Sequence, residues 1–456
     1  ADERSWYSSV TNCFDYYLLD HHADHSHPSV QQASQSKDSS WLKHLDGLRG
    51  IAVLGVLLFH FELLGCVGGY TGVDMFLVLS GFLMTRNILK KLTVNQFSAK
   101  EFYIARFWRL YPSSLLTSLL TVIAAYFIFP PDLALDTVKS ALASMGLMSN
   151  VLFSMEVGGY FDKNVILKPL LHTWSLSLEE QYYFFWPLFL IMIFSLSAGS
   201  DSLPKFYSRL KEIVIWITAL SFALAVHMSI MSPTYAWYLL PTRVYEFTLG
   251  SIALLIGNQI PGSKLFHEIL AVLCFLSLMI SYFVIDDGVY FPGWYSLPST
   301  VGAVLLINLP DTWVSRSILS NRVLRFFGKI SYAAYLVHWP LWVYYCYIKD
   351  SREDGWLIFG LTLVLAYVQL HVYENPMRIS GSTKSAGRKK ALFFLLAVFA
   401  VGFSLLGFMT DGWSFRSSAV SSAVNEEAVK ELLGLPETGA EGNEEYQQRI
   451  QIMPRS

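Results

Sequence analysis

The residues that could do chemistry in this chain lie inside apolar segments, where charged groups are rare. Arg49 and His60 are eleven residues apart in one such segment. At 100° per residue they return to nearly the same face of a helix, separated by about 16 Å of rise. Charged or strongly polar side chains within a membrane span are energetically costly and mark a functional site by default. We therefore expect Arg49 at one mouth of this helix and His60 near the other end.

A carboxylate follows His60 across a short glycine-rich connection. The connection covers residues 65–69, and Asp74 lies about as far beyond it as His60 lies before it. An imidazole and a carboxylate at one depth could pair, which would fix the imidazole tautomer and raise its basicity, as in a general base. A purely structural hydrogen bond explains the spacing equally well. Glu62 faces another side of the helix and is a poor partner for His60.

Two arginines form an R-x-x-R pair at the start of a later apolar segment. Arg106 and Arg109 are three residues apart, with Arg86, Lys90 and Lys91 nearby in the sequence. The spacing puts both guanidinium groups on one helix face. Guanidinium groups suit phosphate, which they bind through paired hydrogen bonds. The alternative interpretation is ordinary anchoring by basic residues at the cytoplasmic surface.

A polar stripe opens another apolar segment. Ser175, Glu179 and Tyr183 recur every four residues. A span with a purely structural role has little use for such a stripe, so we interpret it as the wall of a cavity. Arg243 and Glu246 are three residues apart and could neutralise each other or line the same cavity.

Other signals for chemistry are weaker or absent from the sequence. His338 is a lone histidine in an apolar segment, where such a residue is often only a hydrogen-bonded structural group. No G-x-S-x-G elbow, P-loop, H-E-x-x-H or dinucleotide fingerprint stands in a suitable context. The four cysteines have no C-x-x-C spacing, which argues against a zinc ribbon or a disulfide-stapled fold. We expect no metal site in the apolar region.

The composition requires elements that can position these groups inside a bilayer. Of 456 residues, 53% are apolar and 15% are charged, against a usual charged share of roughly 25%. The mean hydropathy is +0.41. The net charge of −2 gives no basic character that would indicate nucleic acid as a partner. We expect an all-α, polytopic bundle of transmembrane helices.

The apolar runs predict about eleven spans, ten in the core and one that links the C-terminal tail. A helix needs about 20 mostly apolar residues to cross a bilayer. The predicted spans lie near residues 49–64, 70–90, 108–128, 175–196, 213–232, 242–258, 266–285, 297–309, 331–348, 355–373 and 391–409. The stretch 139–156 is apolar but mixed, and we interpret it as an interfacial or re-entrant piece.

The basic residues between spans predict the orientation in the membrane. Most lysines and arginines outside the spans fall in the even-numbered connections, whereas the odd-numbered ones hold few. Cytoplasmic loops carry the excess of basic residues. We therefore expect a multi-pass protein of the plasma or inner membrane, with the N-terminus in the cytoplasm and the C-terminus outside it.

Both ends of the chain differ in composition from the apolar region. Residues 1–40 are rich in Ser, His and Asp, and we expect a disordered cytoplasmic tail; its cluster of His21, His22, His25 and His27 could also bind a metal. We expect a transmembrane domain over 41–380, a further helix over 391–409 and a flexible extracytoplasmic tail over 410–456.

Several runs resemble motifs of the membrane acyltransferase family 3, and they occur in the order of that family. They cover roughly residues 41–380 and read HLDGLRGIAVLGVLLFH, GVDMFLVLSGFL, RFWRLYP, LLHTWSLSLEEQYYFFWP, RVYEFTLG, YAAYLVHWP and YENPMR. The run 158–162 resembles the branch whose members often carry an extracytoplasmic SGNH esterase-like domain after the last span. That branch leaves room for such a domain or partner outside the membrane.

The resemblance implies transfer of an acyl group, usually acetyl, from cytoplasmic acyl-CoA to a hydroxyl of a cell-surface carbohydrate. His60 matches the histidine thought to be catalytic in this family, and we expect Asp74 or Glu179 to orient it. An acyl-histidine intermediate is the competing route. The residues assigned to the donor are Arg49, Arg106, Arg109 and Ser80. Those assigned to the acceptor are Trp174, Ser175, Tyr183, Arg243, Glu246 and His338.

Two other classes of function remain open from the residues alone. A proton-coupled transporter or flippase could use the same intramembrane histidine and carboxylates. A non-catalytic membrane scaffold would tolerate alanine at His60, Asp74 and Arg109 together. Acyl-CoA hydrolysis or transfer in proteoliposomes separates these classes from an acyltransferase.

Overall fold

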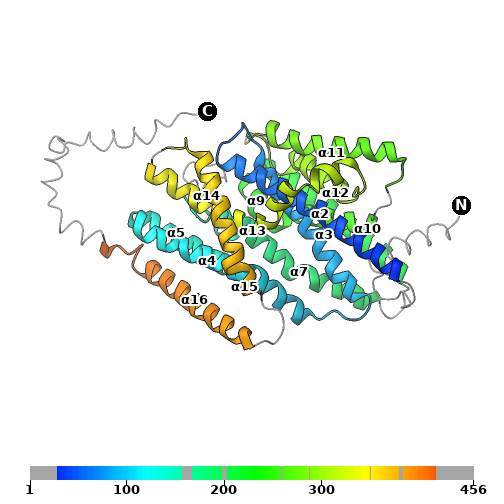
Figure 1. The fold of residues 1–456 in the computed structure, drawn as a ribbon. Helices are drawn as coiled ribbons and strands as arrows, with labels where there is room; N and C mark the ends of the chain where they lie inside the picture. Colours follow the sequence, from blue (N-terminus) through cyan, green and yellow to red (C-terminus); the bar gives the residue numbers. More distant parts are fainter. Residues whose placement is uncertain are drawn as a thin grey trace.

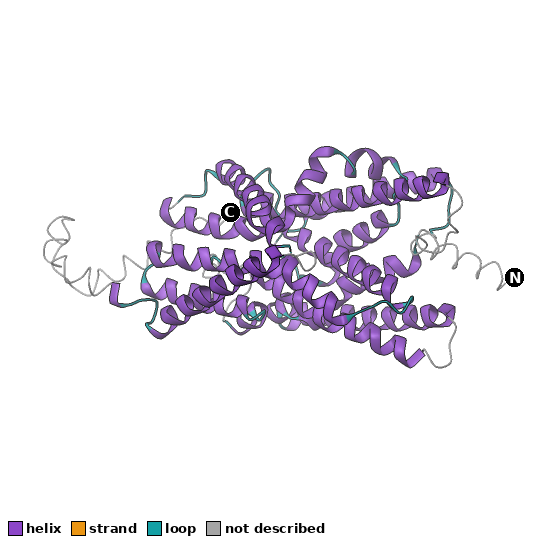
Figure 2. Ribbon diagram, turned by 60° about the horizontal axis from the view of Figure 1, so that its bottom comes forward, coloured by secondary structure: helices purple, strands orange, loops and turns teal. Residues whose placement is uncertain are grey.

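The structure is a computed structural model that describes residues 28–156, 167–197, 203–257, 260–286, 288–349, 351–378 and 384–416. Within these ranges every regular element is a helix and none is a strand (Figure 2). The prediction of an all-α protein is therefore confirmed. The histidine-rich cluster of residues 21–27, the run 158–162 and the tail beyond Arg416 lie outside the described residues.

Long helices and shorter ones are interspersed along the chain (Figure 1). The long helices are α2 (Pro28–His60), α3 (Gly72–Leu92), α4 (Ala99–Ile128), α7 (Thr173–Ser197), α8 (Leu203–Met231), α11 (Lys264–Val284), α13 (Arg322–Lys349) and α16 (Lys384–Met409). The shorter ones are α5 (Pro131–Met145), α6 (Ser149–Met155), α9 (Pro233–Tyr238), α10 (Val244–Ile256), α12 (Leu297–Ile307), α14 (Gly355–Val368) and α15 (Asn375–Met377). Each predicted span overlaps one of these helices.

Six helical segments of the described part of the chain are long and apolar enough to cross a membrane. They are Gly69–Leu92, Ala99–Ile128, Leu203–Met231, Lys264–Val284, Gly355–Met377 and Gly387–Met409, and shorter apolar helices cover Val244–Ile256 and Gly293–Ile307. The total of eleven spans stays a prediction. The helices α2, α7 and α13 do not meet the length and apolarity criteria, and these three carry His60, Glu179 and His338. A helix that carries a polar site is less apolar than one that only faces lipid.

Two predicted boundaries differ from the structure. Residues 28–40, which we expected in a disordered tail, form the N-terminal part of α2. The expected C-terminal tail also begins later than residue 410, because Trp413 is fully buried and its ring lies 5.2 Å from that of Tyr126. This contact holds the end of α16 against α4, and α16 lies along α4 and α5 in Figure 1.

Glycines let α2 approach α13 until their backbones touch. A Cβ atom at Gly50 of α2 would clash with the carbonyl oxygen of Leu324, and one at Gly328 of α13 would clash with that of Asp46. Close backbone approach through small residues is the usual way in which membrane helices pack tightly. Because the two helices cannot slide past such a contact, it sets which residues of α2 and α13 face each other.

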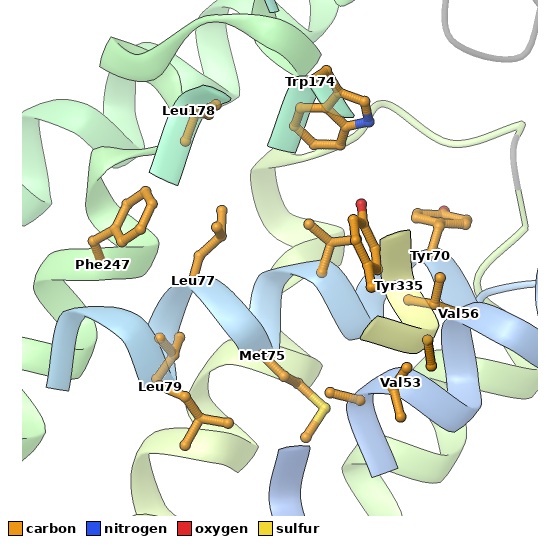
Figure 3. Close-up of a cluster of buried hydrophobic side chains, with 14 of the residues drawn as sticks. Val53, Val56, Tyr70, Met75, Leu77, Leu79, Trp174, Leu178, Phe247 and Tyr335 are labelled. Carbon is orange, nitrogen blue, oxygen red and sulfur yellow. The ribbon is translucent and has the colours of Figure 1, made fainter. Parts of the chain in front are cut away.

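Glycines also let the backbones of α3 and α10 touch, and an apolar core fills the space between the helices. A Cβ atom at Gly81 of α3 would clash with the carbonyl oxygen of Phe247, and one at Gly250 of α10 with that of Val78. Figure 3 shows part of this core, with Val53 from α2, Leu77 from α3 and Leu178 from α7 among its buried side chains. The helices that carry the polar residues thus share one packed interior.

Candidate active site

The histidine that ends α2 lies against a histidine in the middle of α13. Nδ1 of His60 is 3.0 Å from Nε2 of His338, and the ring centroids are 5.0 Å apart. Both side chains are buried. The glycine contact between α2 and α13 holds the two imidazoles in register, although 278 residues separate them in the chain.

A backbone carbonyl determines where the protons of this pair lie. Nδ1 of His338 is 2.6 Å from the carbonyl oxygen of Tyr335, one turn earlier on α13. A carbonyl oxygen can only accept, so Nδ1 of His338 carries the proton and its Nε2 carries a lone pair. Nδ1 of His60 must then donate to His338, which leaves the lone pair of neutral His60 on Nε2. Nε2 of His60 is therefore the atom that can take up a proton.

The start of α7 brings further polar groups to this pair. Oγ of Ser175 is 2.7 Å from the hydroxyl of Tyr335, whose ring lies 5.3 Å from that of His338. The ring of His172, directly before α7, meets His338 edge to face at 5.5 Å. We call His60, His172 and His338 the imidazole cluster. It forms where the end of α2, the start of α7 and the middle of α13 meet.

The predicted pair of His60 and Asp74 does not form among the described residues. Oδ1 of Asp74 accepts from Nη1 of Arg243 at 3.0 Å, and Oδ2 accepts from Ser299 at 3.2 Å. Nη1 of Arg243 also lies 2.6 Å from Oε1 of Glu246. The spacing predicted Asp74 at the depth of His60, but its carboxylate bonds to Arg243, directly before α10, and to Ser299 of α12. Of the two interpretations of Arg243 and Glu246, mutual neutralisation is the one that these contacts support.

Aromatic rings enclose this charged group. The guanidinium carbon of Arg243 lies 5.5 Å from the ring of Trp174, 5.4 Å from that of Trp237 and 5.3 Å from that of Phe291. Trp174 is 1% exposed and Arg243 is 1% exposed. These fully buried side chains bond to and pack on one another and so hold α3, α7 and α10 together. Their burial gives no support to the predicted role of Trp174, Arg243 and Glu246 in binding the acceptor.

The second turn of α7 carries another polar group, around Glu179. Ser80 of α3 donates to Oε1 of Glu179 at 3.1 Å, and the hydroxyl of Tyr183 donates to Oε2 at 2.8 Å. The guanidinium of Arg106 stacks on the ring of Tyr183, 3.6 Å from its centroid. Glu179 thus has its own hydroxyl partners on α3 and α7, so neither carboxylate proposed to orient His60 is bonded to it.

Three arginines gather beside Glu179. Arg49 is half-buried and interacts electrostatically with Glu179 and Arg106. Arg109 is exposed, and Arg49 and Arg106 both act on it electrostatically. We call Arg49, Arg106 and Arg109 the arginine cluster. The like charges stand close together, with the carboxylates of Asp46 and Glu180 nearby as well as that of Glu179. A group of guanidinium groups of this kind is suited to an anionic ligand.

The polar stripe of α7 joins the two clusters. Ser175 lies at the imidazole cluster, whereas Glu179 and Tyr183 lie at the arginine cluster. Ser175 and Tyr183 are separated by about 12 Å of helical rise. The stripe was predicted as one cavity wall; in the structure it runs between a basic end and an end with a proton-accepting imidazole.

A pocket opens beside Glu179 on the side of α4. Its polar lining includes Tyr111, Ser114, Ser177, Glu180 and Tyr332. Among the residues that the structure describes, no group of three or more His, Cys, Asp or Glu side chains could hold a metal ion.

Sequence reasoning missed His172 and Tyr335 and gave His338 too little weight. All three lie in motif runs visible in the chain, HTWSL and YLVHWP. A signal was available, since both runs place a histidine next to tryptophan or threonine in an apolar context. The sequence does not tell which helices are neighbours, and only the packing of α2 on α13 shows that these histidines lie together.

Comparison with known proteins agrees with the motifs. A family model described as an acyltransferase domain matches residues 42–370. Peptidoglycan O-acetyltransferase OatA of Listeria monocytogenes is 30% identical over a 364-residue alignment that covers 75% of this chain and 56% of that protein. YrhL of Bacillus subtilis, provisionally named for the same activity, is 31% identical over 75% of this chain and 55% of its own length. A provisionally named O-acetyltransferase of Staphylococcus aureus is 28% identical over 76% and 58%.

The chain spans little more than half the length of these relatives. No solved structure matches it. The matched region contains both the imidazole and the arginine clusters, and α16 lies beyond its end.

Proposed function

This chain belongs to the membrane acyltransferase family 3, and on that basis we propose that it moves an acyl group, most simply acetyl, across the membrane. The donor is acyl-CoA at the cytoplasmic face, and the acceptor is a hydroxyl group of a carbohydrate outside. Relatives named peptidoglycan O-acetyltransferases support a cell-wall glycan as the acceptor. The N-terminus lies in the cytoplasm in this proposal, as the distribution of basic residues predicts.

The observation that carries the proposal is the separation of two clusters along α7. The guanidinium groups of the arginine cluster can bind the phosphates of CoA through paired hydrogen bonds. The imidazole cluster lies at the other end of the stripe and holds the proton acceptor, Nε2 of His60. A donor with anionic phosphates at one end and a thioester at the end of a long arm matches this order of groups.

The chemical step follows from the tautomer of His60. Nε2 of His60 takes the proton of the acceptor hydroxyl while the hydroxyl oxygen bonds to the thioester carbon. The carbon–sulfur bond then breaks, and the CoA sulfur leaves with the proton that His60 has held. Nδ1 of His60 donates its hydrogen bond to His338 throughout, so the lone pair is on Nε2 before the proton is taken up and again after it has left. In the competing route Nε2 attacks the thioester itself and forms an acyl-histidine.

The test is acyl transfer by the purified chain in proteoliposomes. Labelled acetyl-CoA is supplied on one side and a soluble glycan fragment on the other. We expect label on the glycan with the intact chain, and none with His60→Ala, which should still bind acetyl-CoA. Full transfer by His60→Ala would refute both chemical routes.

Two further readouts separate the alternatives. Label that stays on the protein without an acceptor, and is lost in His60→Ala, indicates the acyl-histidine route. Uptake of a solute that follows a proton gradient and needs no acetyl-CoA would instead indicate a transporter.

A further inference from the structure

His172 is a buried imidazole that has no aligned hydrogen-bond partner among the described residues. Its side chain is 1% exposed, and neither ring nitrogen has a hydrogen-bond partner of acceptable geometry. The backbone of Leu336 is close enough to influence the ring but is not aligned as a partner. Buried polar groups in native proteins are nearly always paired, so an unpaired one in a polar cluster is a candidate for contact with a substrate.

The neighbouring donors are all occupied. Nδ1 of His60 donates to His338, and Nδ1 of His338 donates to the carbonyl of Tyr335. The hydroxyls of Ser175 and Tyr335 bond to each other and to the carbonyl oxygen of His172. These groups therefore offer no N–H or O–H to an incoming molecule.

The first two backbone amides of α7 are occupied as well. The N–H of Thr173 donates to Leu170, and that of Trp174 donates to Leu171. Around His338, the ring of His172 is thus the one polar group with both a proton and a lone pair uncommitted among the described residues.

We propose that His172 is a catalytic residue that donates a hydrogen bond to the carbonyl oxygen of the acyl group during transfer. The inference rests on the function proposed above and names the group that stabilises its transition state. The carbonyl oxygen gains negative charge as the acceptor oxygen bonds to carbon, and loses it when the carbon–sulfur bond breaks. His172 keeps its proton throughout, as a neutral imidazole can when it polarises a carbonyl.

The position of His172 fits this role. Its ring meets that of His338 at 5.5 Å, and His338 contacts His60 at 3.0 Å. His60 and His172 also interact electrostatically. A thioester carbon within reach of Nε2 of His60 therefore lies in the same small cluster as the uncommitted N–H of His172.

The test compares His172→Leu with His172→Gln. Leucine removes the donor and keeps the bulk, whereas glutamine restores an N–H. We expect His172→Leu to lower kcat about 100-fold, the scale of losing one oxyanion donor. The KM for acetyl-CoA should change little, because its phosphates bind elsewhere. The kcat of His172→Gln should be at least tenfold higher than that of His172→Leu.

Stability should move the opposite way from activity. His172→Leu removes an unpaired buried polar group, so its melting temperature should equal or exceed that of the unmodified chain. Thr362→Val is the matched control, because the hydroxyl of Thr362 is also buried and unpaired but lies on α14. It should keep both activity and melting temperature.

Three results would overturn the inference. They are near-normal kcat in His172→Leu, no recovery in His172→Gln, or a melting temperature of His172→Leu well below the control. His60→Ala, measured alongside, keeps this test separate from the proposed function. A fully active His60→Ala refutes the proposed function, whereas an inactive His60→Ala beside a fully active His172→Leu refutes only the role of His172.

Discussion

Nδ1 of His60 lies 3.0 Å from Nε2 of His338, and the carbonyl of Tyr335 fixes the direction of that hydrogen bond. A histidine here takes the place that a carboxylate occupies in many catalytic pairs. Unlike a carboxylate, a neutral imidazole brings no negative charge into the bilayer interior. It can orient its partner without the desolvation cost of a buried anion.

Replacing His338 tests its orienting role. His338→Leu leaves the Nδ1 proton of His60 without an acceptor, so both tautomers of His60 become accessible and kcat should fall about 10- to 100-fold. His338→Gln offers a carbonyl oxygen to that proton and should recover part of the loss. The measurement is the pH dependence of kcat together with KM, since an orienting residue changes kcat and leaves donor binding intact. Equal rates in both variants would contradict the assignment.

Arg243 should be the most sensitive charged residue for stability. Arg243→Met leaves the carboxylates of Asp74 and Glu246 buried without a cation, which should cost about 3–5 kcal/mol of unfolding free energy. The triple variant Arg243→Met, Asp74→Asn, Glu246→Gln removes all three charges and should recover most of that loss. Thermal unfolding in detergent is the measurement. A single variant as stable as the unmodified chain would show that the cluster is not an energetic unit.

Arg106 should control binding of the donor. Arg106→Ala removes a charge-assisted contact, which should raise the KM for acetyl-CoA about 10- to 100-fold. Arg106→Lys keeps the charge but loses the planar stacking on Tyr183, so it should recover only part of the affinity. Arg316→Ala is the control, because Arg316 is an exposed arginine outside the arginine cluster. A KM equal to the control would argue for simple membrane anchoring.

The contact of α2 with α13 should tolerate no side chain. Gly50→Ala places a methyl group against the carbonyl of Leu324 and should lower stability by about 1–3 kcal/mol and reduce kcat, because His60 shifts relative to His338. Gly402→Ala on α16 meets open space and should be neutral or slightly stabilising. The measurements are the unfolding temperature and the kcat of both variants, Gly50→Ala and Gly402→Ala. An active, stable Gly50→Ala would contradict the register argument.

The helices and the polar residues within them could be predicted from the sequence because both are local properties. Apolar runs locate α3 and α8, and a charge inside such a run is conspicuous wherever it falls. The partner of His60 could not be found in this way. Spacing gives the depth of Asp74 but not the direction in which it faces, and that direction depends on which helix packs against α3. The register of α2 on α13 involves residues hundreds of positions apart.

The backbone contact at Gly50 and Gly328 has a consequence for how a substrate can pass through the protein. Alternating-access carriers rock one half of the molecule against the other around a central site. Here the backbones of α2 and α13, which hold His60 and His338, are in direct contact, so the two helices cannot move past each other. The two imidazoles therefore stay together at a fixed place. Under the function proposed above, the acyl group is brought to them from one side of the membrane and taken away on the other.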